Sequence, residues 1–423
     1  MNIILVILSA LALFTPVFSG YVVGIWMIIA SVCLRSETVP SKTFAARQDF
    51  WRILKPILTS GLIFWALLAV AGIWASLDAD VVDIKALRHA LSHAGVKYIV
   101  VLFGFSCFFW RLAPSKDLRT AFAMTYGVAA AVHGVYCIFQ RQYGLDWVHG
   151  INGRLGEGRF AYGVYRIGGL IGHPLTLGYC LVLSLVSCLA LYGLSKSKWE
   201  KNAWLSGVIF SALVLALSGS RGPQLTAVLA SFVLIPYKVV IENWQKISFG
   251  LILLIGFGFF CGAFSRFLEL GNVGAGGDIR WVHWSVHYRI FMDHLVHGIG
   301  PGASNEAISS YYLTAGVNDT IKLAHNSYLQ FAADYGLLGL LGALTWTLSW
   351  ARLAKSVFVV HRAIWSLLAV ILISSITQNT LQDSEFVLAL TIWTLVLIAT
   401  EVEYSGCTST TKKYPNILAR EGG

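Results

Sequence analysis

The sequence predicts an all-α integral membrane protein with about twelve transmembrane helices, organised as a single polytopic domain over residues 1–423. Two observations carry this prediction. Apolar residues make up 57% of the chain and charged residues only 12%, whereas soluble domains carry about 25% charged residues. Long apolar runs also recur along the chain, and ~20 such residues cross the bilayer as a helix. A soluble enzyme, a secreted disulfide scaffold and a nucleic-acid-binding module are therefore excluded.

The apolar runs define the candidate spans and the connections between them. The runs lie at 2–18, 20–34, 55–76, 97–111, 120–140, 170–194, 203–219, 222–237, 247–265, 326–351, 363–381 and 386–402. The longest polar connection is 266–325, between the ninth and tenth predicted helices. We expect this segment to form a long loop on the outer face that carries part of a functional site.

The distribution of basic residues sets the orientation and leaves one feature to explain. With both termini in the cytoplasm, lysines concentrate in the predicted inner loops, in agreement with the positive-inside rule, while arginines divide between the two sides. A charge at membrane depth costs at least ~2.5–3.5 kcal/mol, so such a residue usually faces a cavity or a partner. Four outer arginines stand at or beside predicted helix ends: Arg166, Arg221, Arg280 and Arg289. For Arg154, Arg159 and Arg266, ion pairing or snorkelling at the interface is the simpler expectation.

Arg221 lies in Ser218-Gly219-Ser220-Arg221-Gly222-Pro223, which interrupts a long apolar stretch. The small residues let the backbone turn, and Pro223 suits the start of a new helix. Free N–H groups of that helix beside a guanidinium form an anion site. We therefore predict ligand binding by Arg221 rather than a structural ion pair.

His325 is the candidate general base. It stands in His325-Asn326-Ser327, directly before an apolar helix and after the turn 297–302, HGIGPG. Asn326 or Ser327 can cap the helix, so a capping turn is the structural alternative. At the water-facing mouth of a membrane protein, however, an imidazole can accept a proton near neutral pH.

Four further histidines allow two interpretations. His283 and His287 are spaced i, i+4, and His294 and His297 follow at i, i+3; this spacing could hold zinc on a helix. No HExxH motif appears, and the interleaved Trp and Tyr residues favour an amphipathic helix at the membrane interface. The seven cysteines lie singly, without a CxxC pair, so neither disulfides nor zinc clusters are expected.

Weaker signals flank these motifs. The segment 165–174, YRIGGLIGHP, places Arg166 before small residues, and its His173 reads as a loop-end residue rather than a base. Asp383 and Glu385, between the last two helices, either orient a base or pair with an arginine. The sequence does not decide between these roles.

Three segments together resemble the O-antigen ligase and O-antigen polymerase superfamily of bacterial envelopes. They are SGSRG at 218–222, the stretch from Arg289 to HGIGPG at 289–302, and HNSYLQFAADYGLLGLLG at 325–342. The resemblance implies a multi-spanning, GT-C-like glycosyltransferase in the bacterial inner membrane, with its active site on the periplasmic face. It implies transfer of a glycan from undecaprenyl diphosphate to lipid A–core in the ligase branch, or to another carrier-linked repeat in the polymerase branch.

On this resemblance the donor, the acceptor and membrane lipids are the expected partners, with no nucleic acid, no cofactor and no metal. We assign Arg221 and Arg289 to the diphosphate with Arg166 and Arg280 in support, and His325 to the role of base. Asn326, Ser220 and Asp383 are possible supporting residues. The ligase is the preferred branch. A transporter of anionic glycolipids and a non-catalytic envelope scaffold are the rival classes, and transporters usually show internal repeats.

Overall fold

The computed structural model describes residues 2–13, 41–78, 102–106, 109, 116–144, 146, 148, 160–161, 164–236, 245, 277–300, 305–315 and 323–408. The predicted spans at 20–34 and 247–265 lie outside these residues. The elements are α1 (Asn2–Leu11), α3 (Ser41–Asp78), α6 (Lys116–Tyr143), β1 (Phe160–Ala161), β2 (Val164–Tyr165), α8 (Pro174–Leu194), α9 (Lys198–Leu217), α10 (Arg221–Leu234), α14 (Gly277–Asp293), α15 (Asn305–Thr314), α16 (Ser327–Ser356), α17 (His361–Thr377), η3 (Thr380–Gln382) and α18 (Ser384–Thr408).

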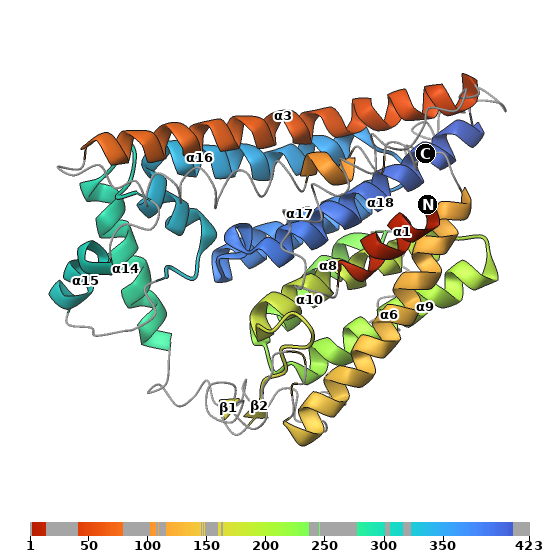
Figure 1. Cartoon of the computed structure of the whole chain (residues 1–423), viewed down its shortest axis with the longest axis horizontal. Helices are drawn as coiled ribbons and strands as arrows, with labels where there is room; N and C mark the ends of the chain where they lie inside the picture. The colour runs from red at the N-terminus through yellow and green to blue at the C-terminus, as the bar shows by residue number, and fades with distance from the viewer. Residues whose placement is uncertain are drawn as a thin grey trace.

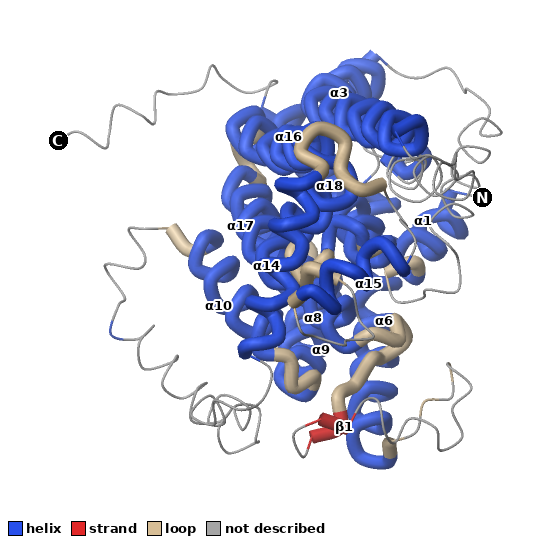
Figure 2. Tube along the Cα trace, turned by 90° about the vertical axis from the view of Figure 1, so that its left-hand side faces the viewer, coloured by secondary structure: helices blue, strands red, loops and turns tan. Residues whose placement is uncertain are grey.

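The long helices form a bundle, and two shorter helices lie across one of its ends (Figure 1). Helices α3 and α16 run side by side along one edge, α17 and α18 occupy the middle, and α8, α9, α10 and α6 complete the other side. Figure 2 views the molecule from the end that α14 and α15 cover. We call this the loop end; it is where α8, α10, α16 and α18 begin and where α9 and α17 finish.

Six helices in the described part of the chain are long and apolar enough to cross a membrane. Their apolar spans are Ala45–Leu77, Arg119–Tyr143, Pro174–Leu194, Lys198–Leu217, Ser327–Ser356 and Ser384–Ser405, and the apolar α17 is shorter. The chain is thus a multi-pass, helical membrane protein, as predicted. The expected total of twelve spans stays a prediction, because several of the runs lie wholly or partly outside the described residues.

Small residues let neighbouring helices approach closely. A Cβ built on Gly127 of α6 would lie 2.8 Å from the Ala203 carbonyl oxygen of α9, and one on Gly207 would lie 2.7 Å from the Tyr126 ring. Such contacts are typical of membrane helix pairs, which gain from van der Waals packing rather than from a hydrophobic drive. Between α3 and α16, the stacked rings of Phe64 and Trp346 fill the interface.

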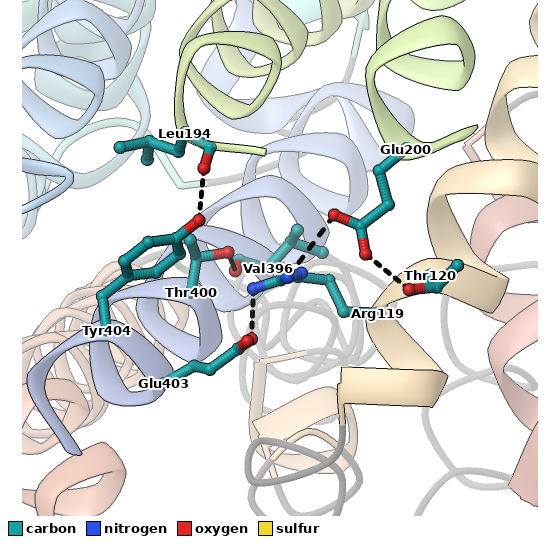
Figure 3. A network of polar contacts seen from close by, with 8 residues as sticks. All are labelled: Arg119, Thr120, Leu194, Glu200, Val396, Thr400, Glu403 and Tyr404. Atoms are coloured by element: carbon teal, nitrogen blue, oxygen red, sulfur yellow. Dashed lines mark hydrogen bonds and ion pairs between the residues drawn. The ribbon is translucent and has the colours of Figure 1, made fainter. Parts of the chain in front are cut away.

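Polar and charged side chains connect α6, α8, α9 and α18 (Figure 3), at the end of the bundle away from α14 and α15 (Figure 1). Arg119 of α6 lies between Glu200 of α9, at 3.4 Å, and Glu403 of α18, which it also contacts. Tyr404 donates to the Leu194 carbonyl at the end of α8. We call this the clamp end, and its Arg119–Glu200–Glu403 cluster the clamp.

The described part of the predicted long loop is ordered as α14 and α15 rather than as an irregular connection. His283, Val286, His287 and Ile290 form the buried face of α14. Trp281 and Tyr288, on the opposite face, are 69% and 57% exposed. This arrangement agrees with an amphipathic helix at the membrane interface, and it points two histidines into the molecule.

Candidate functional site at the loop end

The SGSRGP segment forms a tight turn between two helices, as predicted. Helix α9 ends at Leu217 and α10 begins at Arg221. Gly219 takes a positive φ of 63°, and the buried Ser218 hydroxyl accepts the Ser220 N–H at 3.2 Å. Arg221 is therefore the first residue of a helix, where N–H groups have no intrahelical acceptor and the helix dipole favours an anion.

Arg166 lies beside this turn although 54 positions separate it from Ser220. Its Nη2 atom donates to the Ser220 hydroxyl at 3.4 Å. Because Ser220 directly precedes Arg221, the Arg166 guanidinium contacts the turn from which α10 begins. The loop that carries Arg166 continues into α8, where the His173 ring accepts the Thr176 N–H at 3.4 Å as the N-cap. His173 thus has the loop-end role that the sequence indicates.

The end of α17 connects the arginine turn to His325. Gly222, next to Arg221, lies under Tyr179 of α8, because a Cβ on Gly222 would sit 2.7 Å from the Tyr179 hydroxyl. That hydroxyl is 2.5 Å from the Thr377 hydroxyl at the end of α17. The next residue, Gln378, places its Oε1 3.0 Å from Nδ1 of His325. Consecutive residues, whose Cα atoms are ~3.8 Å apart, therefore reach the two parts of the site.

Helix α14 makes the same connection from the other side. The positive charge of Arg280 acts on the Tyr179 hydroxyl, so the two groups lie near each other. One turn later, the His283 ring meets the His325 ring edge-on, with centroids 5.7 Å apart. Residues three apart share one face of a helix. These contacts connect Arg166, the turn before Arg221, Arg280 and His325 at the loop end, and we call this region the loop-end site.

Arg289 lies elsewhere on α14. It is nine positions after Arg280, which places it about half a turn round the helix. Its charge acts on Tyr311 of α15, where burial and the Asp293 carboxylate raise the tyrosine pKa. Direct participation of Arg289 in the loop-end site stays a prediction; the side chains of Arg280 and Arg289 are both exposed.

The three residues of the HNS motif have separate contacts. Asn326 caps α16 through its side chain, which accepts the Leu329 N–H at 3.1 Å. The Ser327 hydroxyl donates to the Gln378 carbonyl and accepts from the Leu381 N–H, both at 3.1 Å. The capping alternative therefore holds for Asn326, while His325, with φ of 49°, turns its ring toward Gln378.

Asp383, which the sequence suggests as a partner for His325 or for an arginine, contacts a different residue. Asp383 accepts a hydrogen bond from the Thr176 hydroxyl in the first turn of α8. Burial raises the pKa of the Asp383 carboxyl well above its ordinary value, and Glu385 adds to the shift. Glu385 itself accepts from Ser384 at 2.9 Å. The described neighbour of the His325 Nδ1 is an amide, Gln378.

The two buried histidines of α14, His283 and His287, lie on the side of the helix that faces His325. His283 Nδ1 lies 2.5 Å from the Tyr312 hydroxyl of α15, and His287 Nδ1 lies 2.8 Å from the His283 carbonyl. Burial lowers the pKa of His287 to about 4, which keeps its ring neutral at neutral pH. Among the described residues, no group of three or more His, Cys, Asp or Glu side chains could hold a metal ion.

The glycine-rich turn after α14 fixes that helix to a break in α16. At Gly336 the backbone leaves the helical conformation, with φ 62° and ψ −152°. The N–H of Ile299 donates to the Ala333 carbonyl at 2.9 Å, and Leu337 donates to Leu295 at 2.8 Å. The segment 295–300 therefore pairs with carbonyl and N–H groups that the break releases. Pro301 and Gly302 of the motif lie outside the described residues.

Sequence reasoning did not identify Tyr179, Thr377 and Gln378, which connect the two parts of the site. A usable signal existed for Gln378. The polar run 378–383, QNTLQD, between two strongly apolar helices is more polar than a tight turn requires. Tyr179 and Thr377 carry no such signal, because a single hydroxyl within an apolar helix is common.

These observations define a class of protein: a multi-pass membrane protein with cationic and imidazole side chains gathered around one end of its helix bundle. Residues 206–344 match the family model described as O-antigen ligase. The matched segment contains Arg221, Arg280, Arg289 and His325, and this part of the chain is similar to the O-antigen ligase family. The match does not separate ligases from polymerases. The curated proteins include no match to the chain.

Proposed function

We propose that this protein is an O-antigen ligase of the bacterial inner membrane, which transfers a glycan from undecaprenyl diphosphate to lipid A–core on the periplasmic face. The observation that carries the proposal is the double connection at the loop end, through Thr377–Gln378 and through Arg280–His283. These contacts connect the arginines to the imidazole of His325. A reaction with an anionic leaving group needs the cations, and an alcohol nucleophile needs a base.

The cations act on the leaving group. When the glycosidic bond to the carrier breaks, the diphosphate departs with additional negative charge. Arg221 and Arg280, with Arg166 in support, would stabilise that charge, and fixed donors are most effective where charge develops in the transition state. A hydrogen bond between charged partners contributes ~1.5–3 kcal/mol. In this proposal the guanidiniums and the N-terminus of α10 supply the electrostatic stabilisation that a divalent metal supplies in other glycosyltransferases.

His325 acts on the nucleophile. An amide oxygen can only accept a hydrogen bond, so the contact with Gln378 Oε1 requires a proton on Nδ1 of His325. In the neutral ring Nε2 then holds the lone pair. We propose that Nε2 removes the proton from the attacking sugar hydroxyl of the acceptor, an effect typically worth ~10²–10⁴-fold in rate.

Direct displacement by that hydroxyl inverts the anomeric configuration of the transferred sugar. The test uses purified protein in detergent with a carrier-linked glycan and lipid A–core. A ladder of glycans on the core, with inverted linkage to the first sugar, is the expected product. A product with retained configuration would refute the displacement step.

The same assay separates the alternatives. Longer carrier-linked chains without modified core would identify a polymerase, the other branch of the matched superfamily. Detergent removes any sealed compartment, so transfer in detergent excludes an obligatory transport function. Absence of both products, together with vectorial movement of glycolipid in sealed vesicles, would favour a transporter.

A further inference from the structure

A row of side chains on one face of α6 contacts the loop that carries Arg166. His133, Cys137 and Gln140 are spaced i, i+4, i+7 and therefore lie on one face of the helix. Gln140 is fully buried. Its Oε1 accepts the Gly169 N–H at 2.9 Å, and its Nε2 donates to the Gly169 carbonyl at 3.3 Å. One side chain thus engages both backbone groups of one loop residue.

The Gln140 amide is itself held in place. Its Nε2 also donates to the Tyr136 hydroxyl at 3.3 Å, and that hydroxyl donates to Asp146 at 2.7 Å. An amide has one acceptor oxygen and two N–H donors. All three find partners, so the orientation of the side chain is defined.

His133 and Gly169 add a steric constraint. The His133 Nε2 accepts the Leu170 N–H at 3.3 Å. A Cβ on Gly169 would lie 2.4 Å from this nitrogen, and the φ of Gly169 is 55°. Only glycine allows the backbone to lie so close to the imidazole in this conformation.

The residue between Arg166 and this anchor is also fixed. Ile167 is fully buried and belongs to an apolar cluster with Cys137 of α6, Leu177 of α8 and Val214 of α9. The loop from Ile167 to Leu170 is therefore held by α6 through His133 and Gln140, and by α6, α8 and α9 together at Ile167. Arg166 stands at the edge of this anchored segment, with its Nη2 3.4 Å from Ser220.

We propose that Gln140 is a positioning residue for Arg166: it aims the guanidinium at the loop-end site by holding the backbone of Gly169. The inference rests on the proposed function, because it assumes that Arg166 binds the carrier diphosphate. Gln140 acts only on the donor side of the reaction. Its loss should therefore affect the donor and leave the KM of the lipid A–core acceptor unchanged.

The test is a double-mutant cycle on the full-length protein in the transfer assay. Gln140→Met keeps the side-chain volume and removes both contacts with Gly169. We expect kcat/KM for the carrier-linked donor to fall about 10- to 100-fold, as for a displaced catalytic group. Arg166→Lys should also lower it, and adding Gln140→Met to Arg166→Lys should cause no further loss, since coupled residues are not additive.

Ser206→Ala is the matched control. Its hydroxyl donates to the Gly127 carbonyl of α6 at 2.9 Å, a polar contact that does not involve the Arg166 loop, so donor kinetics should not change. If Gln140→Met fails to reach the membrane, Gln140→Glu takes its place in the cycle, because a carboxylate still accepts the Gly169 N–H but cannot donate to its carbonyl.

Multiplicative losses in the double variant, or an equal effect on the acceptor KM, would overturn the positioning role while leaving the proposed function intact. Unchanged donor kinetics in Arg166→Lys alone would remove Arg166 from the diphosphate, and the inference with it.

Discussion

At the scale of single residues, the chemistry of the loop-end site depends on which nitrogen of His325 carries its proton. The 3.0 Å contact with Gln378 fixes the proton on Nδ1. An amide orients the ring as a carboxylate would, but it adds no negative charge that stabilises the imidazolium.

Gln378→Glu tests this point through the pH dependence of transfer. A carboxylate beside the ring favours its protonated form, and an opposite charge at this distance shifts a titration by roughly 1–3 pH units. The acidic limb of the pH–rate profile should move upward by that amount, because a higher pH is then needed to keep His325 neutral. Gln378→Leu removes the hydrogen bond without adding charge, so it should lower the rate without an upward shift. Superimposable profiles for wild type and Gln378→Glu would contradict the assignment of His325 as base.

The arginines differ in their surroundings, and a paired substitution separates their roles. Arg221→Lys keeps the charge but loses the planar fork that binds two phosphate oxygens. Loss of one charge-assisted hydrogen bond, ~1.5–3 kcal/mol, predicts about a 10- to 150-fold fall in kcat/KM for the donor with normal membrane insertion. Arg289 lies about half a turn of α14 away from Arg280, so Arg289→Lys tests its predicted contact with the diphosphate: a fall of similar size supports that contact, and an unchanged kcat/KM removes it. Wild-type turnover in Arg221→Lys would remove this residue from the site.

At the scale of elements, the break in α16 is what attaches α14 to the bundle. Segment 295–300 crosses the break so closely that a Cβ on Gly336 would lie 2.4 Å from the Val296 carbonyl. Gly298 has the reciprocal constraint, since its Cβ would lie 2.3 Å from the backbone of Asp334. The two glycines allow α14 to carry Arg280 and His283 to the site.

Gly336→Ala should therefore detach α14 and lower activity. Its φ of 62° and ψ of −152° lie in a region that essentially only glycine adopts, which alone costs of order 1–3 kcal/mol. We expect a large loss of transfer and faster proteolysis between α14 and α16. Gly193→Ala in α8, where nothing lies within 4 Å of the added methyl group, is the control and should be neutral. Equal behaviour of the two variants would show that the crossing is not required.

The break in α16 also shows where prediction from sequence ends. The apolar run 326–351 predicts a helix there, and the structure contains one. The position of its break follows from backbone contacts with residues about forty positions earlier. The sequence GLLGLLG at 336–342 contains three glycines in similar contexts, so it does not show at which of them the helix breaks. By contrast, the turn at 218–223 was predictable, because its small residues and proline act locally.

At the scale of the whole molecule, the two ends of the bundle have different charge arrangements. At the loop end, arginine and imidazole groups surround the proposed site. At the clamp end, Arg119 contacts two carboxylates, and the side chain of Glu200 is only 1% exposed. Local patterns single out Arg221 and His325 as candidates, but about a hundred positions separate them. Their convergence depends on the packing of α8, α14 and α17, which no local pattern contains.

We predict that the clamp contributes to the stability of the folded protein but not to its affinity for the donor. Arg119→Met leaves Glu200 buried without its cation, and breaking a buried ion pair from one side typically costs ~3–5 kcal/mol. The thermal midpoint in detergent should fall clearly. The donor KM of the folded fraction should stay at the wild-type value, because the start of α6 and the end of α18 lie away from α14 and α15 (Figure 1). Arg52→Met removes the Arg52–Asp49 pair, whose side chains are 79% and 46% exposed, and should leave the midpoint nearly unchanged, as exposed pairs contribute ~0–1 kcal/mol. An equal thermal midpoint for the two variants would show that the clamp does not stabilise the bundle. A changed donor KM in Arg119→Met would show that the two ends of the bundle are coupled.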